Sequence, residues 1–407
     1  MEYTMRTTCR LCRSPHLIEI IDLGMQMIQH AFIHKGKKSP SRSKYPTILV
    51  RCAQEDCGLV QLKHSINPKI LYEVYWYRSN TNNTMKAHLK ALINEALDTS
   101  VVTNPSLLDI GCNDGTMLDF APHEYDKTGI DPSDIALGVH ESIEMINDFF
   151  PSKKLDKRIF DIITSIAMFY DVDDPVGFAK EIKKLLSPDG LWILEVAYLP
   201  TTIRNTSYDT ICHEHLTYYH LGALDQIARQ AGLKVVKADL NGMNGGSIRC
   251  YLTHQNSTMY DDIPSDIEKI KNKETQLMKH AEQYFQTFAK KITLHKKNLL
   301  SLLQKLRNDG KTIHIYGAST KGNTILQYCG IDNTIIDLAA DKNPEKWGAR
   351  TPHSNIPIVS EQTSKDLKPD YYLVLPWSFR DEFLKREKKF RDTGVKMIFP
   401  LPEILIV

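Results

Sequence analysis

The chain has 407 residues, 42% of them hydrophobic, and its 51 Lys and Arg residues nearly balance 49 Asp and Glu residues. This length is typical of two or three domains, and the hydrophobic content excludes wholesale disorder. The formal charge of +2 gives no electrostatic reason to expect a nucleic-acid or anionic-membrane partner. No apolar run approaches a membrane span, and the first residues lack a signal-peptide core, so we expect a cytoplasmic protein.

Four of the eight cysteines form two closely spaced pairs near the N-terminus, Cys9 with Cys12 and Cys52 with Cys57. Two such pairs, far apart in sequence, are typical of a tetrahedral zinc site, because four thiolates supply the negative charge that Zn²⁺ favours. Four thiolates leave no open position for a substrate. We therefore expect a structural zinc that stabilises residues 1–85 directly. The alternative is four buried cysteines without a metal.

Helix and strand signals alternate after this segment. Apolar residues at helical spacing predict a helix over 86–98. Short apolar runs predict strands over 106–111, 128–131, 161–168 and 190–195. Alternating βα units imply a parallel, doubly wound sheet, which binds ligands outside the carboxyl ends of its strands.

The first of these strands opens into the most informative loop of the middle segment, within Leu-Leu-Asp-Ile-Gly-Cys-Asn-Asp-Gly at 107–115. Gly111 and Gly115 allow a tight turn and a close approach to a ligand. Asp131, at the tip of the next strand, is suited to accept hydrogen bonds from ribose hydroxyls. NAD requires the same order of elements, but the carboxylate of Asp114 would repel a pyrophosphate at the helix N-terminus. S-adenosyl-L-methionine (SAM), with its zwitterionic methionine end, is therefore favoured over NAD.

The other expected contacts to SAM follow from the same arrangement of strand ends. Asp109 is expected near the methionine end of the cofactor. Asp148 is expected to bind the exocyclic amine of adenine, and Phe149 to stack on the adenine ring. Asn113, in the glycine loop, and Ala167, at the end of the third predicted strand, complete the predicted cofactor site.

The segment 208–220 follows the fourth predicted strand and holds three histidines, three tyrosines and Glu214. His213 and His215 are two residues apart, so they would not share a helix face, which disfavours a metalloprotease-type metal site. Histidine titrates near neutrality, and a buried Glu or Tyr can orient it. The segment therefore favours acid–base chemistry.

Helical spacing of apolar residues continues over 263–307, and we expect this stripe to lie in the core or at a domain interface. Short apolar runs predict a second α/β unit with strands over 311–317, 335–341, 371–375 and 395–399. In its glycine loop, Ser319, Lys321 and backbone N–H groups are suited to hold a pyrophosphate. Asp341, at the tip of the next strand, is suited to meet a nucleoside. The alternative is a Rossmann-like unit kept for packing.

Taken in order, these motifs resemble the nucleotide-sugar C-methyltransferases, which methylate C3 of a 4-keto-hexose to make branched deoxysugars. The resemblance also includes Asn244-Gly-Gly-Ser247 and spans nearly the whole chain. It implies an α/β protein of three parts: a zinc-binding domain at 1–85, a class I SAM-methyltransferase Rossmann-like domain at 86–262, and a helical linker with a C-terminal Rossmann-like, substrate-binding domain at 263–407.

The resemblance also implies roles for individual residues. His215 corresponds to the family's base, which removes the C3 proton, and Glu214 to the family's Glu. The family's Tyr position is occupied here by Cys212. Tyr75 or Tyr77 matches an N-terminal tyrosine that the family brings to the active site.

A donor to the enolate oxygen lowers the barrier to removal of a proton next to a carbonyl. The candidate donors are Tyr75, Tyr77, Asn244 and the backbone N–H groups at 245–246, and Ser247 is assigned to the same substrate site. His213 is kept as the second candidate histidine.

Two other functions stay open. Because Cys212 replaces a tyrosine, the substrate can be another acidic carbon, or an oxygen, of a different metabolite. A zinc module that binds RNA would use the basic stretch 34–44, but one solvated loop in a nearly neutral chain is weak support. We expect a nucleotide-sugar substrate, no nucleic-acid or membrane partner, and a monomer or small homo-oligomer.

Overall fold

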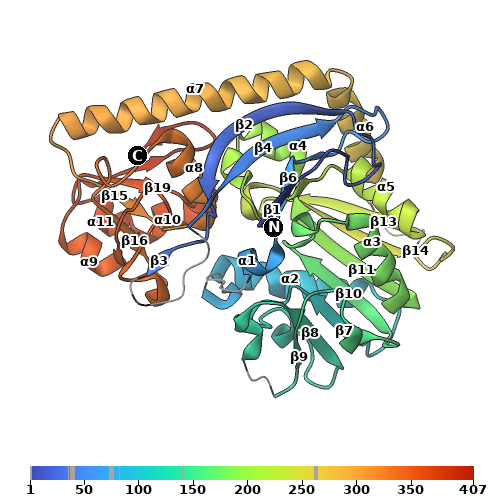
Figure 1. The fold of residues 1–407 in the computed structure, drawn as a ribbon. Coiled ribbons are helices and arrows are strands. Elements are labelled where there is room, and N and C mark those ends of the chain that lie inside the picture. The colour runs from blue at the N-terminus through green and yellow to red at the C-terminus, as the bar shows by residue number, and fades with distance from the viewer. Residues whose placement is uncertain are drawn as a thin grey trace.

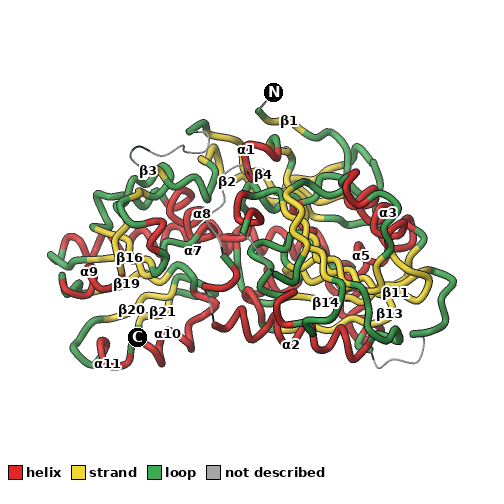
Figure 2. The backbone as a smooth tube through the Cα atoms, turned by 90° about the horizontal axis from the view of Figure 1, so that it is seen from below, coloured by secondary structure: helices red, strands yellow, loops and turns green. Residues whose placement is uncertain are grey.

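The computed structural model describes residues 2–34, 36, 42–72, 78–81, 83–138, 141–260 and 265–407. Two α/β units lie side by side, and an antiparallel sheet from the N-terminal segment runs between them (Figure 1). The view from below shows the same separation, with β16 and β19 in one unit and β11, β13 and β14 in the other (Figure 2). Among the described residues, no helix has both the length and the apolar composition that crossing a membrane requires.

The middle segment forms a seven-stranded sheet in the order β13-β14-β11-β10-β7-β8-β9. Its strands are β7 (Leu107–Ile110), β8 (Lys127–Asp131), β9 (Glu144–Asn147), β10 (Phe160–Ile166), β11 (Leu186–Ala197), β13 (Leu233–Asn241) and β14 (Ser247–His254). The four predicted strands correspond to β7, β8, β10 and β11. They lie side by side in the order β11-β10-β7-β8, and each adjacent pair is parallel. No predicted strand corresponds to β9, β13 or β14, and β14 is antiparallel to both of its neighbours.

Successive side chains of β7 pack against helices on opposite faces of this sheet. Leu107 packs in a cluster with Leu89 and Leu92 of helix α2 (Asn83–Thr99), which contains the predicted helix. Its neighbour Leu108 packs on the opposite face, because successive side chains of a strand point to opposite sides. That second cluster includes residues of α3 (Pro175–Leu185) and α5 (Leu221–Ala231). The carboxyl ends of β7, β8 and β10 are left open between these layers.

The N-terminal sheet incorporates a piece of the segment 208–220. Its order is β12-β5-β4-β2, with every neighbouring pair antiparallel. The strands are β2 (Leu17–Met27), β4 (Lys44–Cys52), β5 (Val60–Leu62) and β12 (Thr217–Tyr218). Beside them lie β1 (Tyr3–Met5), β6 (His64–Ile66) and α1 (Pro68–Tyr72). The histidine-rich segment is therefore held against the N-terminal sheet.

The C-terminal unit has a six-stranded sheet in the order β18-β16-β15-β19-β20-β21. Its strands are β15 (Ile313–Tyr316), β16 (Leu338–Asp341), β18 (Ile358–Ser360), β19 (Tyr371–Val374), β20 (Lys396–Phe399) and β21 (Leu405–Ile406), of which only β21 pairs antiparallel. Its helices are α8 (Thr320–Cys329), α9 (Glu361–Asp366), α10 (Arg380–Arg386) and α11 (Lys388–Arg391). The four predicted strands are confirmed. A two-residue strand, β17 (Ala349–Arg350), pairs with β3 (Ile33–His34) of the N-terminal segment.

The predicted long helix is broken into α6 (Ile267–Met278) and α7 (Ala281–Asn308), and α7 crosses over β2 and the C-terminal unit (Figure 1). The predicted apolar stripe is buried, because α7 packs against α4 (Leu199–Arg204), α8 and β2. Its buried members are Phe285, Phe288, Ile292, Leu299, Leu303 and Leu306.

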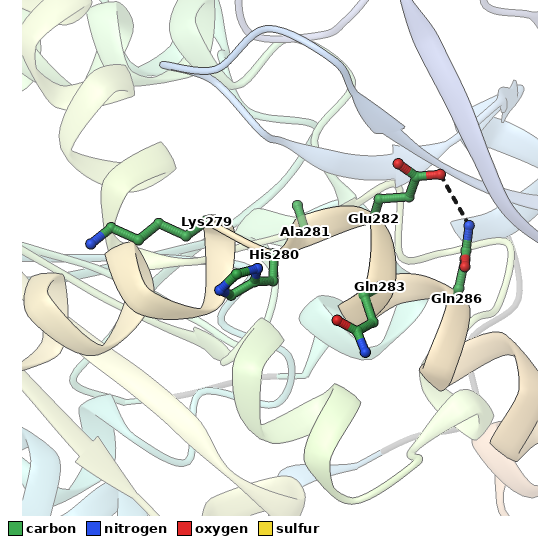
Figure 3. A pocket seen from close by; sticks show the side chains of 6 residues that line it. All are labelled: Lys279, His280, Ala281, Glu282, Gln283 and Gln286. Carbon is green, nitrogen blue, oxygen red and sulfur yellow. Dashed lines mark hydrogen bonds between the residues drawn. The ribbon is translucent and has the colours of Figure 1, made fainter.

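A pocket of about 310 Å³ lies where α6 meets α7. Figure 3 shows its lining, in which the Gln286 amide donates a hydrogen bond of 3.1 Å to Glu282. None of the residues predicted to form a site lines this pocket.

Candidate active site and zinc centre

The four N-terminal cysteines meet at one point. Their Sγ atoms all lie within 4.8 Å of one another, with 3.7 Å between Cys9 and Cys57 and 3.4 Å between Cys12 and Cys52. A tetrahedral zinc with Zn–S bonds of about 2.3 Å requires S–S separations of about 3.8 Å. The thiols therefore fit Zn²⁺, and the predicted set of ligands is brought together. The cluster packs against the core of the middle unit, which suits a structural metal.

A cavity of about 290 Å³ opens at the carboxyl ends of β7, β8 and β10. Among the predicted cofactor residues, those that line it are Asp109, Gly111, Asn113, Asp131, Phe149 and Ala167. Gly115 lies in the adjoining turn with φ of 72°. Asp148 is not part of the lining, and its carboxylate accepts hydrogen bonds from the Phe149 N–H and the Ser152 hydroxyl. Its contact with adenine stays a prediction.

Asp131 is held at the edge of this cavity by three hydrogen bonds. The Ser133 N–H and hydroxyl donate to Oδ1 at 2.9 and 2.6 Å, and the Asn113 N–H donates to Oδ2 at 2.9 Å. A carboxylate has about four acceptor positions. The one that remains is suited to a ribose hydroxyl, so this donor and acceptor set fits the nucleoside part of SAM.

Asp109 and Gly111 shape the opposite part of the cavity. Burial raises the pKa of Asp109 to about 7, although the Thr164 hydroxyl donates to it at 2.7 Å. An ammonium group beside this carboxyl would favour the ionised form, which suits the methionine end of SAM. Gly111 has φ of 74°, and a Cβ there would lie 2.8 Å from Cγ of Met168. Only glycine therefore keeps this wall in place.

His215 has the hydrogen bond that a neutral base requires. Its Nδ1 lies 2.9 Å from the carbonyl oxygen of Thr210, and because a carbonyl only accepts, Nδ1 carries the proton. Nε2 then has a lone pair, and it makes no hydrogen bond to any residue that the structure describes. The ring packs on Tyr170, with 4.2 Å between ring centroids. Burial, followed by the positive charge of Lys321, lowers the pKa of His215 to about 4, so the imidazole is neutral at pH 7.

His213 and Glu214 face the N-terminal sheet. His213 Nε2 lies 3.1 Å from the Thr47 hydroxyl, and its ring lies 5.5 Å from that of His64. Glu214 pairs with Nδ1 of His30. Burial alone would raise the pKa of Glu214, but the interaction with His30 lowers it below its ordinary value. His213 and Glu214 thus hold the segment against the N-terminal sheet and the loop that follows β2.

The C-terminal unit brings α8 against the reactive segment. Ser319 caps α8, because its hydroxyl accepts from the Gly322 N–H at 3.1 Å. Lys321 lies in the first turn of this helix, and its charge acts on His215. The Thr324 hydroxyl reaches the carbonyl of Ile211 at 3.5 Å. Two predicted residues, Ser319 and Lys321, therefore lie where the two α/β units meet.

The other predicted substrate residues are more dispersed. Asp341 accepts from Nζ of Lys346 at 3.2 Å at the end of β16. Asn244 has φ of 54°, and the Ser247 hydroxyl donates to the carbonyl of Met243 at 3.0 Å. Neither Asn244 nor Ser247 lines the cofactor cavity. Tyr75 and Tyr77 lie outside the described residues.

Three residues at this site were missed by the sequence reasoning: His30, Asp171 and Asp209. Asp171 follows β10 and lines the cofactor cavity, so its position after a strand was a usable signal. Asp209 accepts from the indole N–H of Trp377 at 2.8 Å and joins the two α/β units. His30 carries no local signal, because its partner Glu214 is 184 positions away.

Comparison with known proteins covers nearly the whole chain. Three family models match in succession: a zinc binding domain at 9–72, a methyltransferase domain at 81–238 and a C-methyltransferase C-terminal domain at 242–402. C-methyltransferase NovU of Streptomyces niveus is 27% identical over 408 residues, which span 98% of this chain and 96% of that protein.

Partial matches also involve methyltransferases. A ubiquinone biosynthesis O-methyltransferase of Coxiella burnetii is 26% identical over 34% of this chain and 66% of its own. The structure of the plantazolicin methyltransferase BpumL with a monoazolic desmethylPZN analogue and SAH covers 41% of this chain and 82% of its own, at 15% identity and a TM-score of 0.34.

The predicted fold class is confirmed, as are the two predicted cofactors, SAM and zinc. The order of matched domains and the full-length relative agree with the cysteine centre and the cavity at the strand ends. The chain is therefore a SAM-dependent C-methyltransferase with a zinc-binding domain before its methyltransferase domain.

Proposed function

We propose that this C-methyltransferase acts on C3 of a nucleotide-linked 4-keto-deoxysugar, in the synthesis of a branched sugar. The observation that carries the proposal is the position of His215. Its ring packs on Tyr170, whose neighbour Asp171 lines the cofactor cavity, and its segment packs against α8, which carries Lys321. A substrate held there contacts the base, the cofactor cavity and the C-terminal unit.

His215 is the proposed base. A C–H bond next to a carbonyl is acidic enough to lose its proton when the enolate oxygen is stabilised. The lone pair of Nε2 takes the proton, and the Nδ1 hydrogen bond to Thr210 holds the ring while its charge changes. SAM, when bound, supplies an electrophilic methyl group for the carbanion-like carbon. Glu214 keeps the segment in place through its pair with His30.

The nucleotide is assigned to the C-terminal unit. In a doubly wound sheet, ligands bind outside the carboxyl ends of the strands where the strand order reverses. Here the order reverses between β15 and β19, and Ser319 and Lys321 follow β15 directly. The capped N-terminus of α8 and the Lys321 ammonium are suited to a diphosphate. Asp341, after β16, is assigned to the nucleoside.

Mass spectrometry with a panel of nucleotide sugars tests the proposal. Purified enzyme with SAM should add one methyl group to a 4-keto-deoxy sugar nucleotide, and none to the same sugar reduced at C4, because the reduced sugar has no acidic C–H. The panel includes small phenols and 1,3-dicarbonyl compounds as competing acceptors. Methylation of those alone, with every ketosugar unchanged, would refute the sugar assignment.

A further inference from the structure

Asp171 lies between the cofactor cavity and the proposed base. It ends the short helix Phe169–Asp171 that follows β10, and its side chain contributes to the cavity lining. The residue before it, Tyr170, packs its ring on His215. Several carboxyl groups line the described part of the cavity. Asp171 is the one whose neighbour in sequence, Tyr170, contacts His215.

The carboxyl group of Asp171 has unused hydrogen-bonding capacity. Its Oδ1 atom is buried and has no hydrogen-bond partner among the described residues. Such an atom costs free energy unless a ligand or water satisfies it. The charged groups that act on it are Glu214 and Lys321, and the Tyr72 hydroxyl lies close enough to lower its pKa. A ligand at the junction of these groups would meet this carboxyl.

The charge state of Asp171 follows from this environment. Burial, followed by the negative charge of Glu214, raises its pKa well above the ordinary value, and Tyr72 and Lys321 oppose the shift only in part. Burial and Glu214 therefore favour the neutral acid, whose O–H can donate a hydrogen bond. Cys212, which also lies in this region, offers only a thiol, and thiols are weak donors.

The proposed reaction needs a strong donor at this place. The carbonyl oxygen of the substrate is attached to the carbon next to the reacting one, so its partner must lie close to both the cofactor cavity and the base. We propose that Asp171 is a catalytic residue that donates a hydrogen bond to the substrate's carbonyl oxygen and, more strongly, to the enolate oxygen. This role rests on the proposed function.

The proposed methyl transfer requires no further reactant. The proton leaves the substrate carbon for Nε2 of His215, and the electron pair of that C–H bond becomes the enolate, with negative charge on oxygen. When the new C–C bond forms, the carbonyl is restored, the methyl–sulfur bond breaks and its electrons stay on sulfur. Asp171 keeps its proton throughout.

Infrared difference spectroscopy tests the charge state without a substrate. Wild-type enzyme loaded with SAH is compared at pH 7 with Asp171→Asn and with Asp370→Asn. Asp370 is a partly exposed control whose pKa is lowered by its hydrogen bonds to Thr312. Asp171→Asn should remove a protonated-carboxyl C=O band, and Asp370→Asn only carboxylate bands. Loss of carboxylate bands alone in Asp171→Asn would show an ionised Asp171 and overturn the proposal.

Turnover with a ketosugar that the wild type methylates tests the donor role. Asp171→Ala should reduce kcat by about 10²–10³-fold, the effect of losing one oxyanion donor. Asp171→Asn, whose amide still donates, should lie between Asp171→Ala and wild type. Circular dichroism spectra should match the wild type in both variants and serve as the test of folding.

Two failures can be told apart. Wild-type kcat in Asp171→Ala would reject the role of Asp171 while leaving the proposed function intact. A wild type that methylates no ketosugar in the panel would reject the proposed function, and this role of Asp171 with it. The infrared result would then still decide whether Asp171 is a neutral acid.

Discussion

At the residue scale, the two histidines on either side of Glu214 differ in what they contact. His215→Asn should reduce turnover by about 10²–10⁴-fold, because general-base catalysis typically contributes that much. SAM affinity should stay near wild type, because His215 is absent from the cavity lining. Steady-state kinetics and calorimetry provide the two measurements.

His213→Asn is the matched control, since its imidazole faces Thr47 and the N-terminal sheet. It should reduce stability more than kcat. If His213→Asn is inactive while folded and His215→Asn turns over at the wild-type rate, the base has been assigned to the wrong histidine.

Lys321 should influence the pH dependence of the reaction through the pKa of His215. Its charge helps to lower the pKa of His215 to about 4, so Lys321→Gln should raise that pKa towards the ordinary value. The acid limb of kcat/KM should then move to higher pH, and NMR titration of the His215 imidazole should move with it. An unchanged imidazole titration would mean that the two groups are not coupled.

Asp131→Ala tests the cofactor site. Hydrogen bonds to charged groups are worth about 1.5–3 kcal/mol, so SAM affinity should fall about ten- to a hundredfold. Asp148→Ala is the comparison, because Asp148 lies outside the cavity lining. Equal losses of SAM affinity in both variants would show that Asp148 also contacts the cofactor, and unchanged affinity in Asp131→Ala would reject the assignment of Asp131.

Site residues differ in how far local sequence predicts them. Asp109 and Asp131 were predictable, because each occupies a strand end beside a glycine turn. Asp171 also follows a strand, but what sets it apart is burial near Glu214 and Lys321, which come from other parts of the chain. The different directions of His213 and His215 likewise depend on contacts with Thr47 and Thr210, which spacing does not reveal.

At the element scale, a bound zinc would join the two cysteine loops into one unit. Cys9→Ser should lower the zinc content and the melting temperature, because metal binding contributes directly to the folding of such small modules. Cys250→Ser is the control, since that buried cysteine lies in β14 and is not one of the four clustered thiols. Elemental analysis of reduced protein should give one zinc per chain for wild type and Cys250→Ser. Full zinc content in Cys9→Ser would contradict the assigned ligands.

Elements with a strong local pattern were the ones predicted from sequence. Helix α2 and strands β7, β15 and β19 follow from apolar periodicity. The two-residue strand β12 does not, because it exists only through pairing with β5, more than 150 positions earlier. The break between α6 and α7 falls at Lys279 and His280, where neither proline nor glycine marks an end.

At the scale of the whole molecule, buried neutral histidines make stability depend on pH. Burial lowers the pKa of His64 to about 3 and of His213 to about 4, and burial with Lys321 lowers that of His215 to about 4. The unfolded chain binds these protons from about pH 6.5 downwards, while the folded state excludes them. Stability is therefore fully present above about pH 6.5 and falls towards pH 4.

Each such imidazole contributes a slope of at most about 1.4 kcal/mol per pH unit. Urea unfolding at pH 7.5, 6 and 5 measures this loss. His64→Asn should flatten the dependence, because the unfolded state then has one proton fewer to bind. Equal stability at pH 7.5 and pH 5 in the wild type would contradict this account of the buried histidines.

We propose that the methyl group is transferred to a carbon next to the carbonyl of a nucleotide-linked sugar. Incubation of the enzyme with SAM carrying a ¹³C-labelled methyl group and a 4-keto-deoxy sugar nucleotide, followed by ¹³C NMR of the product, measures this directly. We predict a labelled methyl signal in the range of a methyl attached to carbon, coupled to the ring carbon at C3. A labelled methyl attached to oxygen, or no transfer to any ketosugar, would contradict the account.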